Sequence, residues 1–240
     1  MQDSLTVSNS ETAALDALLR PNHLHGLEEA RSAAPKLPGV YAWYFDQVPP
    51  GVPVEGCHQV AGHVLLYVGI APKGTKGSAT KPSERTLRCR LGDHVAGNAE
   101  GSTIRLTLGC LLADTLGIQL RRVGSGRRRT FTNPGERVLD RWMADHARVT
   151  WVAVEEPWVV EKLLLAALSL PLNLQGNRHP FVPTLKRISV KPSSAPKPCR
   201  CWRTTAAPAD SFRRRFLERW RWVASERQRR SALTSASVRR

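Results

Sequence analysis

The sequence predicts a mixed α/β domain of the α+β class, in which a sheet of three strands is flanked by helices. Three short runs rich in β-branched and aromatic residues, at 37–45, 64–70 and 148–155, predict the strands. Segments with apolar residues at helical spacing surround these runs and predict the helices. With 240 residues, of which 41% are hydrophobic, the chain can bury one substantial core. We therefore expect one main domain with an appended tail.

The first two predicted strands each carry a tyrosine, Tyr41 in LPGVYAWYF and Tyr67 in VLLYVGI. The connection between them is rich in Pro and Gly, which favours pairing of the two strands in one sheet. On an ideal strand, Tyr41, Trp43 and Phe45 share one face of the sheet, whereas Tyr44 points to the other. The third strand is predicted from its alternation of apolar and polar residues.

Helical patterns occupy six segments: residues 11–19, 24–33, 83–97, 102–117, 135–146 and 158–170. Three serines, Ser10, Ser83 and Ser102, are expected to cap helices at their N-termini. Pro157 stands where the first residue of a helix tolerates proline. The helix that follows is apolar almost all round, and a single carboxylate, Glu161, interrupts its apolar surface.

The formal net charge of +16 is concentrated in the C-terminal part of the chain. Residues 1–181 carry 20 Lys and Arg against 17 Asp and Glu, whereas residues 182–240 carry 16 against 3. A Ser/Pro/Ala/Lys-rich segment near residue 188 resembles a linker, and residues 210–230 have the pattern of a basic amphipathic helix. We therefore expect a domain over residues 1–187 and a basic tail that is partly helical or disordered. Such a tail attracts polyanions without sequence preference.

The sequence lacks the marks of a secreted or membrane protein. Five cysteines, an odd number, show no spacing typical of a zinc site, which favours a reduced compartment. The N-terminus has no basic start followed by an apolar run, and no stretch approaches the roughly 20 apolar residues that span a bilayer. We expect a cytoplasmic protein with no membrane partner.

An ordered set of residues resembles the GIY-YIG nuclease family over residues 37–181. The set comprises two strand motifs, two residues four apart on one helix, a carboxylate on a later helix and an asparagine in a Pro-Leu-Asn segment: Gly39-Val40-Tyr41, Tyr67-Val68-Gly69, Arg90, His94, Glu161 and Asn173. It is most similar to the branch containing type II restriction endonucleases. The resemblance implies a mainly antiparallel sheet. The chain departs from the family pattern in having Val for Ile in both motifs and a long basic insertion after Arg90.

The resemblance implies a metal-dependent endonuclease that hydrolyses phosphodiester bonds in double-stranded DNA. Such chemistry needs an activated water, stabilised charge on the phosphoryl oxygens and a leaving 3′ oxygen. Glu161 is the only carboxylate of the set and is the natural ligand for Mg²⁺ or Mn²⁺. Arg90 can hold the scissile phosphate through its planar donors. Tyr41 would orient or deprotonate the attacking water, which requires nearby positive charge because its ordinary pKa is about 10.

The other three residues of the set would support these roles. Tyr67 would contact the phosphate or support Tyr41, and His94 would relay a proton or bind phosphate. Asn173 would hold Glu161 or the backbone of the site in place. Taken alone, each residue has an ordinary structural explanation: a core tyrosine, a solvated helix face, or, for Asn173, a helix C-cap.

Basic residues outside this set are candidates for contacts with the DNA backbone. They lie in a Gly/Lys loop after the second strand and in a basic loop or hairpin around a Gly-Ser-Gly turn: Lys73, Lys76, Arg121, Arg122, Arg127, Arg128 and Arg129. Two other functions stay open, a non-catalytic DNA-binding protein that retains the fold and a repair or mobile-element nuclease. Cleavage of both strands would require a homodimer or two successive events.

Overall fold

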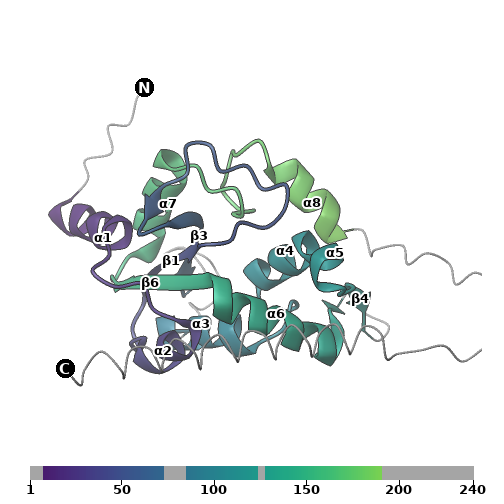
Figure 1. Cartoon of the computed structure of the whole chain (residues 1–240). Coiled ribbons are helices and arrows are strands. Elements are labelled where there is room, and N and C mark those ends of the chain that lie inside the picture. The colour runs from purple at the N-terminus through teal and green to yellow at the C-terminus, as the bar shows by residue number, and fades with distance from the viewer. Residues whose placement is uncertain (1–7, 73–84, 124–127, 191–240) are drawn as a thin grey trace, which may run out of the picture. The chain divides into compact units, whose positions relative to one another are not determined.

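The computed structural model describes residues 8–72, 85–123 and 128–190. Its centre is an antiparallel sheet with the strand order β2-β3-β1-β6, flanked by helices, which confirms the predicted α+β class (Figure 1). The strands of this sheet are β1 (Gly39–Phe45), β2 (Gln59–Val60), β3 (His63–Ala71) and β6 (Ala147–Ala153).

The sheet has four strands, not the three that the sequence predicts. The extra strand, β2, has two residues and pairs with the start of β3 across a tight turn at Ala61-Gly62. Both turn residues have positive φ, 48° and 77°, as the turns that best join antiparallel strands require. A two-residue strand is too short to show the alternation by which strands are predicted.

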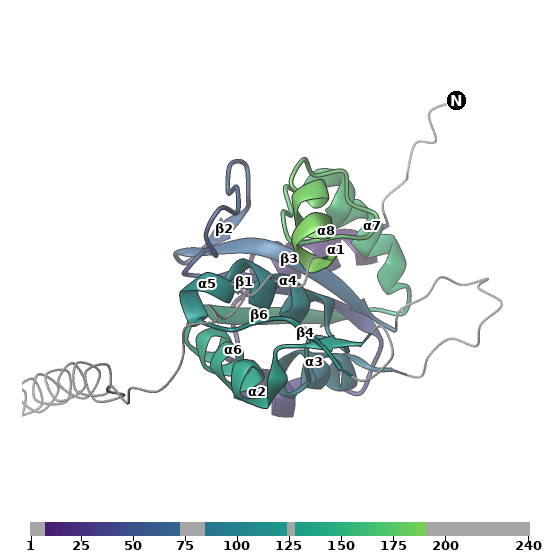
Figure 2. The same cartoon turned by 90° about the vertical axis from the view of Figure 1, so that its right-hand side faces the viewer.

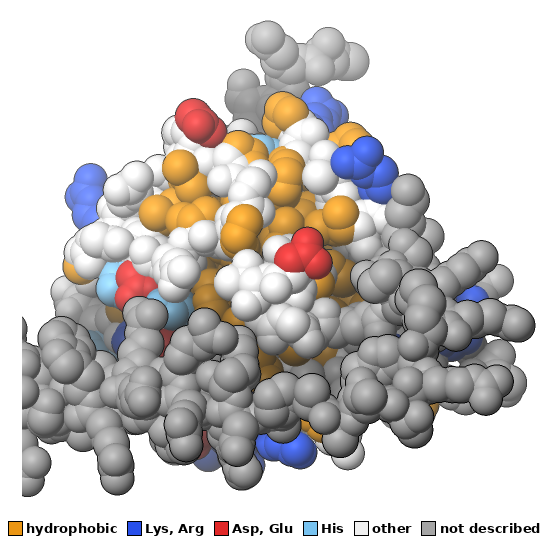
Figure 3. Space-filling view, turned by 45° about the vertical axis from the view of Figure 1, so that its right-hand side comes forward, with side chains coloured by type: hydrophobic (Ala, Val, Ile, Leu, Met, Phe, Trp, Pro, Cys, Tyr) orange, Lys and Arg blue, Asp and Glu red, His pale blue; other side chains and the backbone are white. Residues whose placement is uncertain are grey.

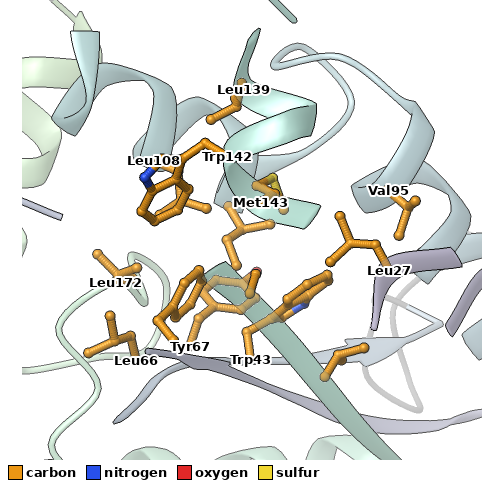
Figure 4. Packing of buried hydrophobic residues seen from close by; sticks show 14 of the residues in the cluster. Leu27, Trp43, Leu66, Tyr67, Val95, Leu108, Leu139, Trp142, Met143 and Leu172 are labelled. Atoms are coloured by element: carbon orange, nitrogen blue, oxygen red, sulfur yellow. The ribbon is translucent and has the colours of Figure 1, made fainter. Parts of the chain in front are cut away.

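Strand β1 is buried on both faces and divides the core into two clusters. Tyr41, Trp43 and Phe45 belong to one cluster and Tyr44 to the other, as the alternation of a strand predicts. Figure 4 shows Trp43 on the same side of the sheet as Tyr67, facing side chains of a helix.

A β-bulge in β3 changes the facing of its side chains. The pairing with β1 passes from Tyr67, opposite Trp43, to Leu65, opposite Tyr44, so that Leu66 is an extra residue. Leu66 and Tyr67 consequently lie in the same core cluster although they are adjacent in sequence.

Helices cover both faces of the sheet (Figures 1 and 2). The first and seventh pack on the face that holds Tyr44, and the second, third, fourth and sixth on the face that holds Tyr41. The helices are α1 (Asn9–Leu19), α2 (Leu27–Ala33), α3 (Leu87–Ala96), α4 (Thr103–Leu111), α5 (Ala113–Leu116), α6 (Thr132–His146), α7 (Pro157–Ala167) and α8 (Val182–Val190).

Two helix caps differ from the predicted ones. Ser8, not Ser10, caps α1, because its side chain accepts from the amide of Glu11 while the Glu11 carboxylate accepts from the amide of Ser8. Thr86 caps α3 in place of the predicted Ser83, which lies outside the described residues. In both cases several residues of capping type stand close together, so the pattern marks the region and not the residue.

Helices α4, α6 and α7 agree with the sequence in position and differ at their ends, whereas α8 is a helix that the sequence does not predict. Ser102 caps α4 as predicted, and the helical segment that follows it divides at Leu112 into α4 and α5. Helix α7 begins at Pro157 as predicted but ends at Ala167, three residues before the predicted end. Helix α6 begins at Thr132, three residues earlier than predicted.

The basic segment after α5 forms a small hairpin, the second of the two alternatives that the sequence leaves open. Its strands are β4 (Arg121–Arg122) and β5 (Arg129–Thr130). Lys73, Lys76, Arg127 and the tail from residue 191 lie outside the described residues.

The surface offers two further observations. Figure 3 shows hydrophobic side chains gathered at the centre of one face, with isolated Lys and Arg side chains toward its rim. Among the described residues, no helix is long and apolar enough to cross a membrane.

Candidate active site

A cleft of about 160 Å³ opens beside β1 and β3. Four of the six predicted site residues line it, namely Tyr41, Tyr67, Glu161 and Asn173. The other lining residues are Gly69, Ile70, Thr103, Trp158, Leu174 and Gln175. The fold thus brings together residues from two strands, a later helix and the segment after it, which are up to 132 positions apart in the sequence.

The two remaining predicted residues, Arg90 and His94, are buried on α3, next to Tyr41. The hydroxyl of Tyr41 lies 2.8 Å from Nε2 of His94, and Nδ1 of His94 lies 2.7 Å from Oγ of Ser102. All three side chains are fully buried, so their hydrogen bonds do not compete with solvent. A buried chain of hydrogen bonds therefore leads from the N-cap of α4 to the wall of the cleft.

Donor counting favours one direction for this chain. As the N-cap of α4, Oγ of Ser102 accepts from the amide of Arg105 at 3.3 Å. Among the described residues, its own proton has one acceptor, Nδ1 of His94. His94 is then protonated on Nε2 when neutral and donates to the oxygen of Tyr41. The hydroxyl of Tyr41 also interacts with Arg90 and with the hydroxyl of Tyr67, at the wall of the cleft that both tyrosines line.

Electrostatics at the cleft favour the neutral form of both tyrosines. Burial raises the pKa of Tyr41 well above its ordinary value, and the neighbouring Tyr67 adds to the effect, while Arg90 lowers the pKa. Burial also raises the pKa of Tyr67, with Arg90 again opposing it. The positive charge expected near Tyr41 is therefore present as Arg90. Burial nevertheless raises the pKa of Tyr41 more than Arg90 lowers it.

Gly69 makes room for the ring of Tyr41. The two residues are direct partners in the β1–β3 ladder, and a Cβ at position 69 would overlap the Tyr41 hydroxyl and ring carbons. A glycine at this position is thus a steric requirement for the placement of the Tyr41 hydroxyl, and not a means of turning the chain.

The guanidinium of Arg90 is held through Nη1, whereas its Nε and Nη2 groups are less well bonded. Its Nη1 donates to the carbonyl oxygen of Gly101 at 3.0 Å and lies 3.8 Å from Oδ2 of Asp93. Its Nε and Nη2 are buried and make no hydrogen bond of good geometry within the described part of the chain. Because buried polar groups are normally satisfied, these donors indicate a place for an acceptor.

Glu161 enters the cleft from α7. This helix begins at Pro157 and packs Val160 and Leu164 against the sheet, so that the half-buried Glu161 lies at the edge of the packed surface. Its negative charge raises the pKa of Tyr41 and of Tyr67. A hard cation bound by this carboxylate would offset that effect.

Asn173 is bonded to the backbone of β3. Its side-chain oxygen accepts from the amide of Val68 at 2.9 Å, and its side-chain nitrogen donates to the carbonyl of Val68 at 2.8 Å. The neighbouring amide of Leu172 donates to the carbonyl of Leu66 at 3.1 Å. Asn173 thus holds the backbone of the cleft wall. It is not a helix C-cap, because α7 ends six residues earlier, at Ala167.

A buried ion-pair network around Arg105 of α4 joins helix α3 to helix α6. Arg105 is fully buried, with Nη2 2.8 Å from Oε2 of Glu136 and Nη1 2.7 Å from Oδ1 of Asp140. Its Nη1 also donates to the carbonyl of His94 at 3.2 Å. The sequence pattern does not predict this role of Arg105, and it predicts Ser102 only as a cap. The buried role of Arg105 could have been predicted from its position as a lone arginine in an otherwise apolar helix.

Of the predicted DNA-contacting residues, the four that the structure describes do not line the cleft. Arg121, Arg122 and Arg128 are exposed in or beside the β4–β5 hairpin. The backbone amide of Arg129 donates to Oε2 of Glu100 at 2.9 Å, which ties the hairpin to the loop before α4.

Comparison with known proteins places this architecture in a family. A family model described as the GIY-YIG catalytic domain matches residues 39–189, more than half of the chain. The match begins with β1 and ends in α8, so it includes every residue that lines the cleft. No curated protein and no solved structure matches the chain. The chain therefore belongs to the GIY-YIG catalytic domain family, and its fold is that of a nuclease.

Proposed function

We propose that this protein is a metal-dependent DNA endonuclease, using Mg²⁺ or Mn²⁺, with the chemistry of the branch that contains type II restriction endonucleases. The observation that carries the proposal is the convergence of Tyr41, Tyr67, Glu161 and Asn173 on one cleft. Arg90 and His94 lie immediately behind Tyr41.

The donors at the cleft fit a hard divalent ion. Glu161 offers a carboxylate oxygen, which Mg²⁺ and Mn²⁺ prefer over nitrogen or sulfur ligands, and water and phosphate oxygens can fill the other positions. When bound, such an ion would neutralise charge on the phosphate and lower the pKa of water.

Tyr41 is the residue that orients and deprotonates the attacking water in this proposal. Its buried phenol is neutral in the free protein, accepts from Nε2 of His94 and is aimed at the cleft. It therefore orients the attacking water. To act as the base, Tyr41 would first release its proton to solvent in the cleft, which leaves a phenolate that the charge of Arg90 stabilises. The phenolate would then take a proton from the attacking water. Tyr67 supports Tyr41 from the neighbouring strand, with 6.5 Å between the ring centroids.

Arg90 donates hydrogen bonds to a phosphate oxygen of the DNA. Its buried Nε and Nη2 groups, which make no well-aligned hydrogen bond among the described residues, are the donors for this role. Asn173 acts indirectly, by fixing the backbone of β3 at Val68, between the two residues Tyr67 and Gly69 that line the cleft.

Replacing Glu161 with glutamine should lower plasmid cleavage at least about 100-fold, because a metal ion supplies several kcal/mol of transition-state stabilisation. Glu155→Gln is the matched control, since this exposed glutamate lies just before the same helix and does not line the cleft. Cleavage is measured with Mg²⁺, with Mn²⁺ and with chelator. Equal cleavage by Glu161→Gln and the parent protein, or no cleavage by the parent with either ion, would contradict the proposal.

Replacing Ser102 with alanine should reduce kcat about tenfold or more and leave KM unchanged, because the hydroxyl sets the protonated nitrogen of His94. The change also removes the cap of α4, which costs roughly 1 kcal/mol. Ser8→Ala is the control, because it removes the cap of α1 at a comparable cost without touching His94. If Ser8→Ala and Ser102→Ala have the same kcat, Ser102 is only a cap.

Two finer features of the proposal need separate tests. A restriction enzyme should cut unmethylated DNA and spare the same DNA after methylation, whereas a repair or mobile-element nuclease should not discriminate. One cleft cuts one strand at a time, so a concerted double-strand cut requires a second copy of the chain. Removing residues 191–240, which leaves α8 whole, separates catalysis from electrostatic binding: cleavage survives in an enzyme, whereas a non-catalytic DNA-binding protein loses its affinity.

A further inference from the structure

A second cluster of metal-ligand side chains lies away from the cleft, between α1 and α2. It consists of His23, His25 and Glu29, one of which, Glu29, is on α2. None of the three lines the cleft that holds Glu161. The catalytic proposal gives these residues no role.

His25 is held in place by β6. Its amide donates to the carbonyl of Val149 and its carbonyl accepts from the amide of Val149, each at 2.9 Å. Its ring stacks on Trp151, with centroids 4.2 Å apart and planes 27° from parallel. Both the backbone and the ring of His25 are therefore fixed before any ion binds, which lowers the entropy cost of coordination.

The three side chains present their ligand atoms to one point. Nε2 of His23 lies 3.1 Å from Oε2 of Glu29, and Nδ1 of His25 lies 2.8 Å from Oε1 of the same carboxylate. All the ligand atoms lie within 4.8 Å of one another. Ligands bound at about 2.0–2.2 Å to a tetrahedral zinc ion stand roughly 3.3–3.6 Å apart, so small side-chain rotations suffice.

The contact between His25 and Glu29 is short but poorly aligned. Nδ1 of His25 is buried and lies 2.8 Å from Oε1 of Glu29, at angles that do not make a well-directed hydrogen bond with any described residue. A buried ring nitrogen of this kind needs a partner along its lone pair. An ion placed among the three groups would supply that partner.

We propose that His23, His25 and Glu29 form a zinc site that joins the segment after α1, helix α2 and strand β6. Two imidazoles and one carboxylate are a ligand set that zinc accepts, with water in the fourth position. Imidazole ligands favour zinc over magnesium, so the site differs in chemistry from the Glu161 cleft. Zinc at this point is a clamp on the edge of the sheet, because His25 is already paired with Val149 and stacked on Trp151.

The test is calorimetric titration of the full chain with Zn²⁺ in a Glu161→Gln background, which weakens metal binding at the cleft. His23→Gln and Glu29→Gln should each weaken one zinc equivalent about tenfold or more and abolish the zinc-dependent rise in melting temperature. His63→Gln and Glu28→Gln are matched controls, because His63 and Glu28 lie outside the cluster.

Comparing zinc binding between variants separates the contribution of this site from zinc bound by cysteines and histidines elsewhere in the chain. Both control variants should bind zinc and gain melting temperature as the parent does. Equal zinc binding and equal thermal shifts in all four variants would overturn the proposal and leave His23, His25 and Glu29 as a surface cluster without a metal. Neither readout involves DNA, so the result is independent of the proposed nuclease activity.

Discussion

Replacing Tyr41 with phenylalanine should lower the rate of DNA cleavage by a factor of roughly 100 to 10,000, the usual contribution of a positioned acid or base. The hydroxyl joins the buried His94 to the cleft, and phenylalanine removes it while keeping the ring that packs over Gly69. Single-turnover cleavage at saturating protein measures the effect, because it separates chemistry from DNA binding.

Tyr44→Phe is the matched control for this change. Tyr44 is on the same strand, is equally buried and loses a comparable hydrogen bond, from its hydroxyl to the carbonyl of Leu18 at 2.8 Å. Its side chain points to the opposite face of the sheet. The control should cost stability and leave the cleavage rate within about twofold of the parent. If Tyr41→Phe and Tyr44→Phe cleave equally well, Tyr41 is a core residue without a chemical role.

Replacing Arg105 with methionine should lower the free energy of unfolding by about 3–5 kcal/mol, the cost of leaving a buried charge without its partner. The carboxylate of Glu136 would keep its hydrogen bonds from the amides of Ala99 and Phe131 but lose the cation at 2.8 Å. Urea denaturation followed by circular dichroism measures the change.

Arg20→Met provides the comparison for Arg105. Arg20 pairs with Asp16 on α1 at 3.4 Å, with both side chains mostly exposed, so its removal should change the stability little. The double variant Arg105→Met with Glu136→Gln should recover part of the loss, because it removes the unpaired charge. Similar midpoints for Arg105→Met and Arg20→Met would mean that the network is relaxed by solvent and does not support α3.

The sequence predicts the strands from local patterns, and it predicts the site residues from an ordered set that resembles the GIY-YIG nuclease family. The alternation in LPGVYAWYF places Tyr41 and Tyr44 on opposite faces, and the structure confirms this. Glu161 is visible in the sequence as the one carboxylate in an apolar helix, and the structure places it on the cleft with Tyr41. The catalytic roles of these residues stay predictions.

What the sequence does not predict depends on contacts between distant segments. The link from Ser102 to His94 requires α3 and α4 to meet at a particular angle, which no periodicity encodes. The pairing of Arg105 with Glu136 joins residues 31 positions apart on two helices. The fourth strand, β2, is not predicted because its two residues pair with β3 across a tight turn and are too few to show an alternating pattern.

The amide of Asn173 has a consequence for solubility as well as for the cleft. Among the described residues, β3 has no neighbouring strand on one side beyond its first residues, and the Asn173 side chain and the Leu172 amide occupy backbone groups there. An unpaired strand edge is a template on which other chains can add. One side chain therefore has two effects: it holds the wall of the cleft and it occupies backbone groups at a strand edge. A variant that lost this amide would expose the backbone of Val68, and self-association could begin there.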